Sequence, residues 1–263
     1  MNILVCIKRV PDTGENEIEL NSDGNDIKRD DLVYSINEWD NYAVEEAIRI
    51  KEKHGGSVTV VTVDSEEGDE VLRRELAMGA DKGVLLMDQA FEGSDGQGIA
   101  RILKALVEKG EYDMVLTGVQ ADDGAGQVGG MLAAMLDWPY ASIVNKIEIL
   151  DEKKIRVHRE VAGGNLEVYE LDLPCVLSIQ TGINEPRYVP LRGVMKASAL
   201  DVPVYGASDL GLPPDSVGGA NAKVKRRNYF IAESGDGAEM LEGSTDEIVE
   251  KLIDLLKSKG GIK

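Results

Sequence analysis

Cysteine, histidine and large aromatic residues are scarce in this sequence, which has two Cys, two His, two Trp and two Phe among 263 residues. Two cysteines do not make a disulfide scaffold, and with only two histidines the sequence offers no zinc site. Cys6 and Cys175 each lie inside an apolar, strand-like run, so we expect both to be small buried residues. The sequence contains no Ser-His-Asp or Cys-His set, and it predicts neither a catalytic residue nor a metal ligand.

Long apolar runs are also missing, since none approaches the roughly 20 residues that a membrane-spanning helix needs. The first residues, MNILVCIKRV, lack the pattern of a signal peptide, so we expect no membrane insertion and a cytoplasmic location. Basic residues are outnumbered, with 29 Lys and Arg against 48 Asp and Glu, a formal net charge of −19. This charge argues against polyanionic partners, both nucleic acid and anionic membrane surfaces.

What the sequence does contain is an alternation of strand and helix patterns. Apolar runs at residues 3–7, 57–63, 83–87 and 114–117 predict buried strands. Apolar residues at helical spacing lie between and after them, at Ala43, Val44, Ala47 and Ile48, at Val71, Leu72 and Leu76, at Ile99, Ile102, Leu103, Leu106 and Val107, and at Val128, Met131, Leu132, Met135 and Leu136. The order predicts an α/β fold of the doubly wound, adenine nucleotide alpha hydrolase-like kind, a mostly parallel open sheet with helices on both faces.

The pattern changes after about Ala141. Residues 143–150, 154–161, 166–171 and 175–179 read as successive strands with hairpin turns between them, which predicts an antiparallel extension of the sheet. Residues 205–222 are rich in Gly, Pro, Ser and Asp and predict a linker. We therefore expect a nucleotide-binding domain over 1–204, and a linker with a C-terminal arm over 205–263. The arm ends in an amphipathic helix, and Ser244 and Glu247 before it have capping-box spacing.

The glycine-rich stretch GVQADDGAGQVGG, residues 118–130, follows a strand and opens a helix. Small residues let the backbone approach a ligand, and free N–H groups at the start of a helix favour a phosphate. The stretch is neither the dinucleotide fingerprint nor a Walker motif, so an ordinary strand-to-helix turn is the alternative. Asp122 and Asp123 suit ribose hydroxyls or a helix cap better than a phosphate.

Three other segments are expected beside this loop, because the carboxyl ends of parallel strands meet at one edge of a sheet. They are the end of the first strand at Cys6, the end of the second at Val63, and residues 37–40 before the first helix. Together they could enclose an adenosine, with Cys6 and Val63 as an apolar wall and backbone groups near Asn37 reading the adenine edge.

Residues 184–197, NEPRYVPLRGVMKA, carry two prolines and three basic residues in an otherwise acidic chain. One interpretation is a packed connecting loop. The other is an exposed docking segment in which Leu191 is an apolar anchor surrounded by polar groups.

Several of these segments resemble the beta subunit of electron transfer flavoproteins, and the resemblance covers nearly the whole chain. The matching text is LVCIKRVPD, AVEEAIRIKEK, ELAMGAD, GVQADDGAGQVGGMLAAMLDWP and LPCVLSIQTGINEPRYVPLRGVMKA. Gly126 and Val128 depart from it, standing where many members have Asn and Thr.

The resemblance implies an electron carrier subunit rather than an enzyme. Members pair with an alpha subunit that carries a redox-active FAD, accept electrons from acyl-CoA dehydrogenases and similar flavoenzymes, and pass them to a membrane quinone oxidoreductase. The beta subunit usually holds a structural AMP. The corresponding positions here are Cys6, Asn37, Glu38, Trp39, Asp40, Val63, Asp122, Asp123, Gly124, Ala125, Gly126, Gln127, Val128, Gly129, Gly130, Met131, Leu132 and Ala133.

The resemblance also implies three contacts with other proteins. Leu191 matches a recognition loop that anchors on the dehydrogenase, Glu160 matches a glutamate that helps to position the mobile flavin domain, and the C-terminal extension matches an arm around the alpha subunit. Two alternatives stay open. One is an electron-bifurcating relative with a second FAD in place of AMP that oxidises NADH, although LDWP is usual in the AMP-binding branch. The other is a stand-alone adenine-nucleotide-binding regulator of the universal-stress type.

Overall fold

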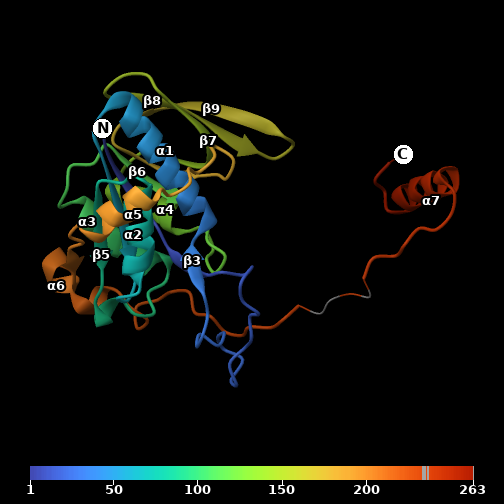
Figure 1. Ribbon diagram of the computed structural model, residues 1–263, viewed down its shortest axis with the longest axis horizontal. Coiled ribbons are helices and arrows are strands. Elements are labelled where there is room, and N and C mark those ends of the chain that lie inside the picture. Colours follow the sequence, from blue (N-terminus) through green and yellow to red (C-terminus); the bar gives the residue numbers. More distant parts are fainter. Residues whose placement is uncertain (233–234, 236, 263) are drawn as a thin grey trace. The chain divides into compact units, whose positions relative to one another are not determined.

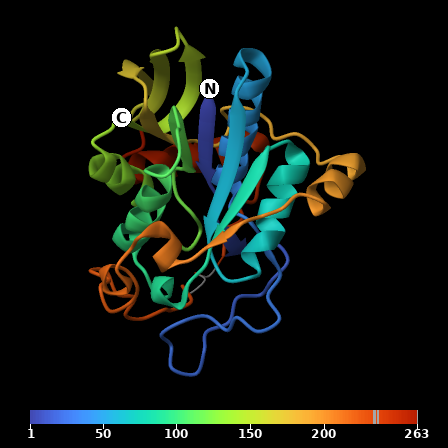
Figure 2. The same ribbon diagram turned by 90° about the vertical axis from the view of Figure 1, so that its left-hand side faces the viewer.

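The computed structural model describes residues 1–232, 235 and 237–262, and most of its strands lie in one mixed sheet (Figures 1 and 2). In sheet order these strands are β11 (Val204–Tyr205), β5 (Lys82–Leu86), β4 (Ser57–Val63), β1 (Asn2–Cys6), β6 (Met114–Gly118), β10 (Cys175–Ile179), β7 (Tyr140–Ile149), β8 (Lys154–Val161) and β9 (Asn165–Asp172). A short antiparallel pair, β2 (Arg9–Pro11) with β3 (Tyr34–Ile36), stands apart from this sheet.

Every pairing from β11 to β7 is parallel, whereas β7, β8 and β9 pair in antiparallel fashion. The helices are α1 (Glu38–His54), α2 (Gly68–Met78), η1 (Gln89–Phe91), α3 (Gly96–Val107), α4 (Val128–Leu136), α5 (Leu191–Ser198), α6 (Ala207–Leu210), η2 (Pro214–Ser216) and α7 (Thr245–Ser258). The arrangement confirms the predicted α/β class and the antiparallel extension. The turn before β9 uses Gly163 and Gly164, both with positive φ, as a tight hairpin requires.

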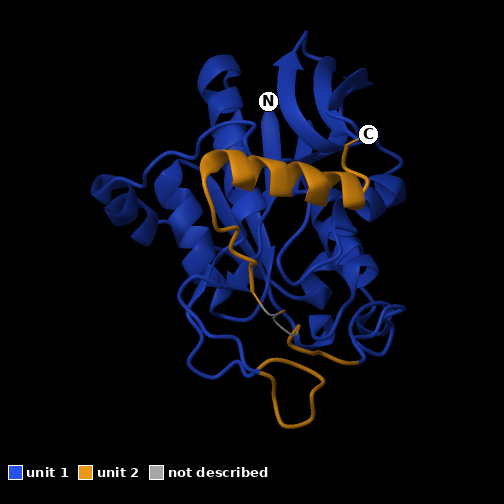
Figure 3. Ribbon diagram, turned by 90° about the vertical axis from the view of Figure 1, so that its right-hand side faces the viewer, with its two compact units in different colours: residues 1–19, 28–227 blue, residues 20–27, 228–263 orange. Residues whose placement is uncertain are grey.

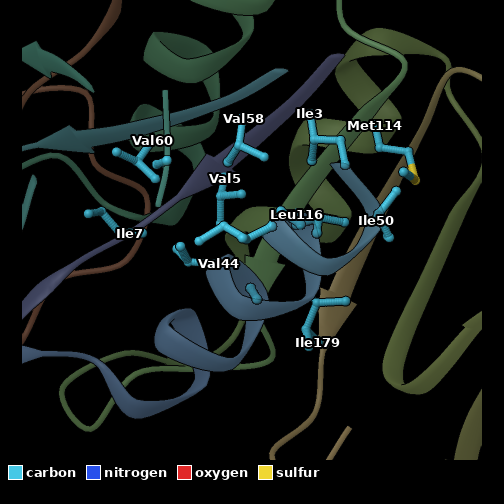
Figure 4. Close-up of a cluster of buried hydrophobic side chains, with 14 of the residues drawn as sticks. Ile3, Val5, Ile7, Val44, Ile50, Val58, Val60, Met114, Leu116 and Ile179 are labelled. Atoms are coloured by element: carbon cyan, nitrogen blue, oxygen red, sulfur yellow. The ribbon is translucent and has the colours of Figure 1, made fainter. Parts of the chain in front are cut away.

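Two hydrophobic clusters cover the two faces of the sheet, because successive side chains of a strand point to opposite sides. On β1, Ile3 and Val5 belong to the cluster under α1, α2 and α5, whereas Leu4 and Cys6 belong to the one under α3, α4 and α6. Figure 4 shows part of the first cluster, to which Val44 of α1 and Val5 of β1 both contribute. Helices on both faces are therefore held by buried strands of Val, Ile and Leu, as the continuous apolar runs predict.

The chain forms two compact units, residues 1–19 with 28–227 and residues 20–27 with 228–263 (Figure 3). The first unit extends past residue 204, where composition predicts a linker, because β11 pairs with β5 and the side chains of Ala207, Leu210 and Val217 are buried. In the second unit, Ser244 and Glu247 form the predicted capping box of α7. Of the residues described, none lies in a helix with both the length and the apolar character to cross a membrane.

Candidate functional site

The carboxyl ends of three adjacent strands, β4, β1 and β6, form the edge where sequence reasoning places a ligand. The chain passes from β1 to β4 and β5 on one side, and then returns through α3 to β6 on the other side of β1. The connections after β1 and β6 therefore diverge, which defines a topological switch point, the usual ligand position in open α/β sheets.

Asp40, in the first turn of α1, joins the two diverging strand ends. Its Oδ2 accepts a hydrogen bond from the Lys8 N–H and its Oδ1 accepts one from the Gly118 N–H, both at 2.8 Å. Burial raises the pKa of this carboxyl to about 7, and the hydrogen bonds oppose that rise by stabilising the charged form. Asp40 thus fixes the distance between the loops that follow β1 and β6.

Asn37, the residue before α1, is almost fully buried at the same edge. Its Nδ2 donates to the Gln120 carbonyl at 2.8 Å, and its backbone N–H donates to the Lys8 carbonyl at 2.8 Å. Among the described residues, its buried Oδ1 has no hydrogen-bond donor. Because a buried acceptor normally has a partner, this oxygen suits a ligand donor such as an amino or hydroxyl group.

The glycine-rich loop leads into α4, whose N-cap Gln127 makes no side-chain capping bond. The N–H groups of Val128, Gly129 and Gly130 therefore start the helix without an intrahelical acceptor, as in sites that bind phosphate. A Cβ on Gly129 would lie 2.4 Å from the Ser178 Oγ, so this glycine lets α4 pack directly on β6 and β10. Gly126 has φ of 63° and turns the chain into the helix.

The remaining residues predicted for this site differ in their exposure. Cys6 belongs to the second hydrophobic cluster and Val63 packs against it, and burial raises the pKa of the Cys6 thiol. Leu132 and Ala133 are buried in that cluster and Met131 packs against it. The exposed residues are Glu38, Asp122, Asp123, Gly124, Ala125, Gly126 and Gln127, while Trp39 and Val128 are half-buried.

Lys8 is a site residue whose pairing sequence reasoning did not find. Its Nζ forms an ion pair with Asp123, and the Arg226 guanidinium donates to the Asp123 carbonyl at 3.3 Å. The sequence signal for this pairing was Asp122-Asp123 in a loop suited to a phosphate. Negative side chains beside a phosphate need a nearby cation to offset their repulsion. A cavity of about 430 Å³ adjoins this pair, lined by Lys8, Arg9, Arg29, Tyr34, Val63, Asp64, Glu67 and Asp123.

Leu191 is the first residue of α5, which packs on α2. Its exposed fraction is 76%, and Tyr188 and Met195 beside it are 93% and 68% exposed. The part of residues 184–197 from Leu191 onward is helical rather than a loop. These three side chains, which we call the α5 patch, are held out toward solvent.

Glu160 lies on β8, where its carboxylate accepts from the Asn145 Nδ2 at 3.1 Å and from the Gln180 Nε2 at 3.4 Å. The Trp39 indole donates to the Gln180 Oε1 at 3.2 Å, so a hydrogen-bonded chain connects the start of α1 with Glu160. Within the ranges that the structure describes, no group of His, Cys, Asp and Glu could hold a metal ion.

These features define a doubly wound α/β protein with a polar, glycine-lined switch point. The family model described as "Electron transfer flavoprotein domain" matches residues 25–210. The chain is 38% identical to the electron transfer flavoprotein subunit beta of Methylophilus methylotrophus, over 99% of this chain and 100% of the relative. It is also 38% identical to the Bos taurus subunit beta, over 100% of this chain and 99% of the relative. Identity is 37% to the caffeyl-CoA reductase-Etf complex subunit CarD of Acetobacterium woodii, over 98% of this chain and 99% of the relative. The chain belongs to the electron transfer flavoprotein family, among its beta subunits.

Proposed function

We propose that this carrier subunit binds AMP at the switch point and pairs with an alpha subunit that holds the redox-active FAD. The heterodimer takes electrons from acyl-CoA dehydrogenase-type flavoenzymes and passes them toward a membrane quinone oxidoreductase. The observation that carries the nucleotide part lies at one sheet edge, where the buried Asn37 Oδ1 has no partner among the described residues and α4 begins without a side-chain cap. A cytoplasmic location stays a prediction.

The residues of the site suit a mononucleotide. The Asn37 Oδ1 would accept from the adenine or ribose, Cys6 and Val63 would contact the apolar ring, and the first N–H groups of α4 would face the phosphate. AMP itself supplies no redox chemistry here, so its contribution is stability through binding to the folded state. Lys8 keeps Asp123 paired and so limits repulsion between that carboxylate and the phosphate.

The bifurcating alternative, in which a second FAD replaces AMP and NADH is oxidised, has one observation in its favour. The cavity of about 430 Å³ begins beside Val63 and Asp123 and is lined by three basic and three acidic side chains, so a ligand longer than a mononucleotide could extend into this polar space. CarD is named as a subunit of a complex with a reductase, whereas the Methylophilus relative is named only as a subunit beta. The chain is 37% identical to the first and 38% identical to the second, so sequence identity favours neither candidate function.

Partner contacts are proposed for three places. The α5 patch takes the dehydrogenase, with Leu191 as its anchor, because it presents large, exposed apolar side chains at the start of α5 and just before it. Glu160 helps to position the flavin domain of the alpha subunit. The helix α7 contacts the alpha subunit through an apolar face, since the side chains of Val249, Leu252 and Leu255 are exposed.

The nucleotide content of the complex decides between the two candidates. The chain is co-expressed with its alpha subunit, the purified complex is denatured, and the released nucleotides are separated by chromatography and identified by mass. One FAD and one AMP per heterodimer support the carrier with AMP. Two FAD and no AMP would establish the bifurcating alternative.

Docking is tested separately with Leu191→Ala, for which we expect kcat/KM with the dehydrogenase to fall by about tenfold or more and nucleotide content to stay unchanged. Leu150→Ala, which truncates another exposed leucine in the turn after β7, is the matched control. Loss of nucleotide with normal electron transfer would contradict a docking role. Glu160→Ala should change reactivity with partners more than FAD content.

A further inference from the structure

The segment between β10 and α5 contains Tyr188 of the α5 patch and leads directly into Leu191. It has little regular structure, and several polar contacts fasten it to α1. The Asn184 Nδ2 donates to the Tyr42 carbonyl at 3.1 Å and to the Glu46 Oε2 at 3.0 Å. The Arg49 Nη2 donates to the Glu185 carbonyl at 3.2 Å. These contacts fix the start of the segment, and Arg187 fixes its middle.

Arg187 holds two carboxylates of α1 at once. Its Nε and Nη2 donate to the two oxygens of Glu45 at 2.8 and 3.1 Å, and its Nη1 and Nη2 donate to those of Glu52 at 2.6 and 3.0 Å. Its backbone N–H donates to Glu45 as well, at 3.2 Å. Residues 45 and 52 are two helical turns apart, so they lie on one face of α1 and both reach the planar guanidinium.

The Glu45 end of this clamp is buried, with 2% of its side chain exposed. Burial by itself would raise the pKa of Glu45, but hydrogen bonds from Arg187 and Arg49 outweigh it and hold the pKa below its ordinary value. Bidentate pairs between arginine and carboxylate are stronger and more directional than single contacts. The position of the Arg187 backbone is therefore determined in the free chain.

The other end of the α5 patch is fixed on α2. A Cβ on Gly193 would lie 2.2 Å from the Ala77 carbonyl oxygen, so α5 lies directly against the backbone of α2. The Arg73 Nη1, on α2, donates to the Ala197 carbonyl at 2.7 Å and so holds the last turn of α5. Between the Arg187 clamp and this contact, Leu191 has no long flexible connection on either side.

We propose that Arg187 is a positioning residue for docking, which acts through Glu45 and Glu52 to hold the α5 patch in its bound arrangement before the dehydrogenase arrives. This inference rests on the proposed docking role of the patch. Because the segment is ordered beforehand, association does not lose the conformational entropy of ordering it. A loosened clamp weakens docking and leaves electron transfer within the docked complex unchanged.

The test measures KM and kcat of the complete heterodimer with its dehydrogenase as electron donor. We expect Arg187→Gln to raise KM by about tenfold, the scale of ordering one or two residues, with kcat within about twofold of wild type and nucleotide content unchanged. Arg187→Lys keeps the positive charge but lacks the planar guanidinium, so we expect its KM to lie between those of wild type and Arg187→Gln. The matched control is Arg156→Gln, since Arg156 also pairs with two carboxylates, Glu148 and Glu170, on the antiparallel strands.

A second variant, Glu52→Gln, keeps the proposal testable if Arg187→Gln fails to fold. Glu52→Gln removes the exposed half of the clamp, keeps the buried pair of Arg187 with Glu45, and should raise KM by about two- to threefold. When Arg187→Gln is added to Leu191→Ala, we expect little further rise in KM, because both substitutions act on the same docking surface.

Three outcomes separate this inference from the proposed function. If Leu191→Ala weakens docking but both clamp variants leave KM unchanged, the positioning role is wrong and the docking proposal stands. If the clamp variants lower only the unfolding temperature, the clamp is structural and the inference is again wrong. If Leu191→Ala itself has no effect, the docking proposal fails and the inference fails with it.

Discussion

Glu75, a carboxyl buried on the inward side of α2, gives the protein a defined pH dependence of stability. Its side chain has no solvent exposure, and within the described part of the chain neither oxygen has a hydrogen-bond partner. The nearest cation is Arg74, whose Nε lies 3.8 Å from the Glu75 Oε1. Burial raises the pKa from its ordinary 4.5 to about 8, Arg74 opposes this, and Asp40 and Glu45 add to it.

The sign follows from proton binding. Between pH 4.5 and 8 the folded chain keeps a proton on Glu75 that the unfolded chain has lost, so the free energy of unfolding falls as pH rises through this window. One group contributes at most about 1.4 kcal/mol per pH unit. Because interiors relax and admit water, we expect a total of roughly 2–4 kcal/mol for the window. Below pH 4.5 both states are protonated and Glu75 adds no further slope.

Glu75→Gln removes the titration while keeping the shape of the side chain. Its amide gains a buried donor that needs a partner, and this costs about 1–3 kcal/mol equally at every pH. The decisive quantity is therefore the slope, measured as the difference between variant and wild-type heterodimers in urea unfolding from pH 5 to 8. Relative to wild type, the variant should become steadily more stable as pH rises. Glu70→Gln, an exposed glutamate of the same helix, is the control. A constant difference across the range would show that Glu75 does not titrate there.

Two further predictions concern the proposed nucleotide site. Gly129→Ala places a Cβ 2.4 Å from the Ser178 Oγ, so we expect α4 to shift, with a loss of stability of about 1–3 kcal/mol and lower nucleotide content. The control is Gly235→Ala, outside the proposed site, where an added Cβ meets nothing within 4 Å; it should change neither stability in thermal melts nor nucleotide content in the same assay. Asp40→Asn leaves one strand-end N–H facing an amide N–H₂ group, and we expect about 1–3 kcal/mol of destabilisation in urea together with release of nucleotide. Full nucleotide retention in Asp40→Asn would contradict its place at the site.

Local pattern predicts the elements of this fold well, because each buried strand carries its own apolar signal. The runs at residues 3–7 and 57–63 correspond to β1 and β4, and the turn at Gly163 and Gly164 joins an antiparallel pair. The pairing of β11 with β5 was not predictable in this way. Val204 and Tyr205 are only two residues in a Gly- and Pro-rich stretch, and their strand exists because β5 offers an edge. Long-range pairing of so short a segment leaves no periodicity to detect.

The contacts that fix the site are also long-range, which explains why sequence reasoning located its segments but not its interactions. Asp40 was predicted beside a nucleotide as part of residues 37–40, yet its carboxylate binds the backbone of Lys8 and Gly118, and no local pattern encodes such partners. The same holds for Arg187 and Glu45, which lie 142 positions apart and each resemble an ordinary charged surface residue in the sequence. Charged residues in amphipathic patterns are usually solvated, so only the folded chain reveals the buried exceptions.

The acidic side chains at the carboxyl ends of β1 and β6 are compatible with the phosphate site that we propose, because backbone N–H groups and a lysine pair with their charges. At a phosphate site, the α4 N–H groups supply the positive end, and Gly129 brings that helix onto the sheet. The carboxylate of Asp40 can therefore connect the ends of β1 and β6, because it accepts hydrogen bonds from the backbone N–H groups of Lys8 and Gly118. Asp123 has its own cation in Lys8. Although the chain has a net charge of −19, the carboxylates of Asp40 and Asp123 are thus already paired, which favours the anion site that we propose at this edge.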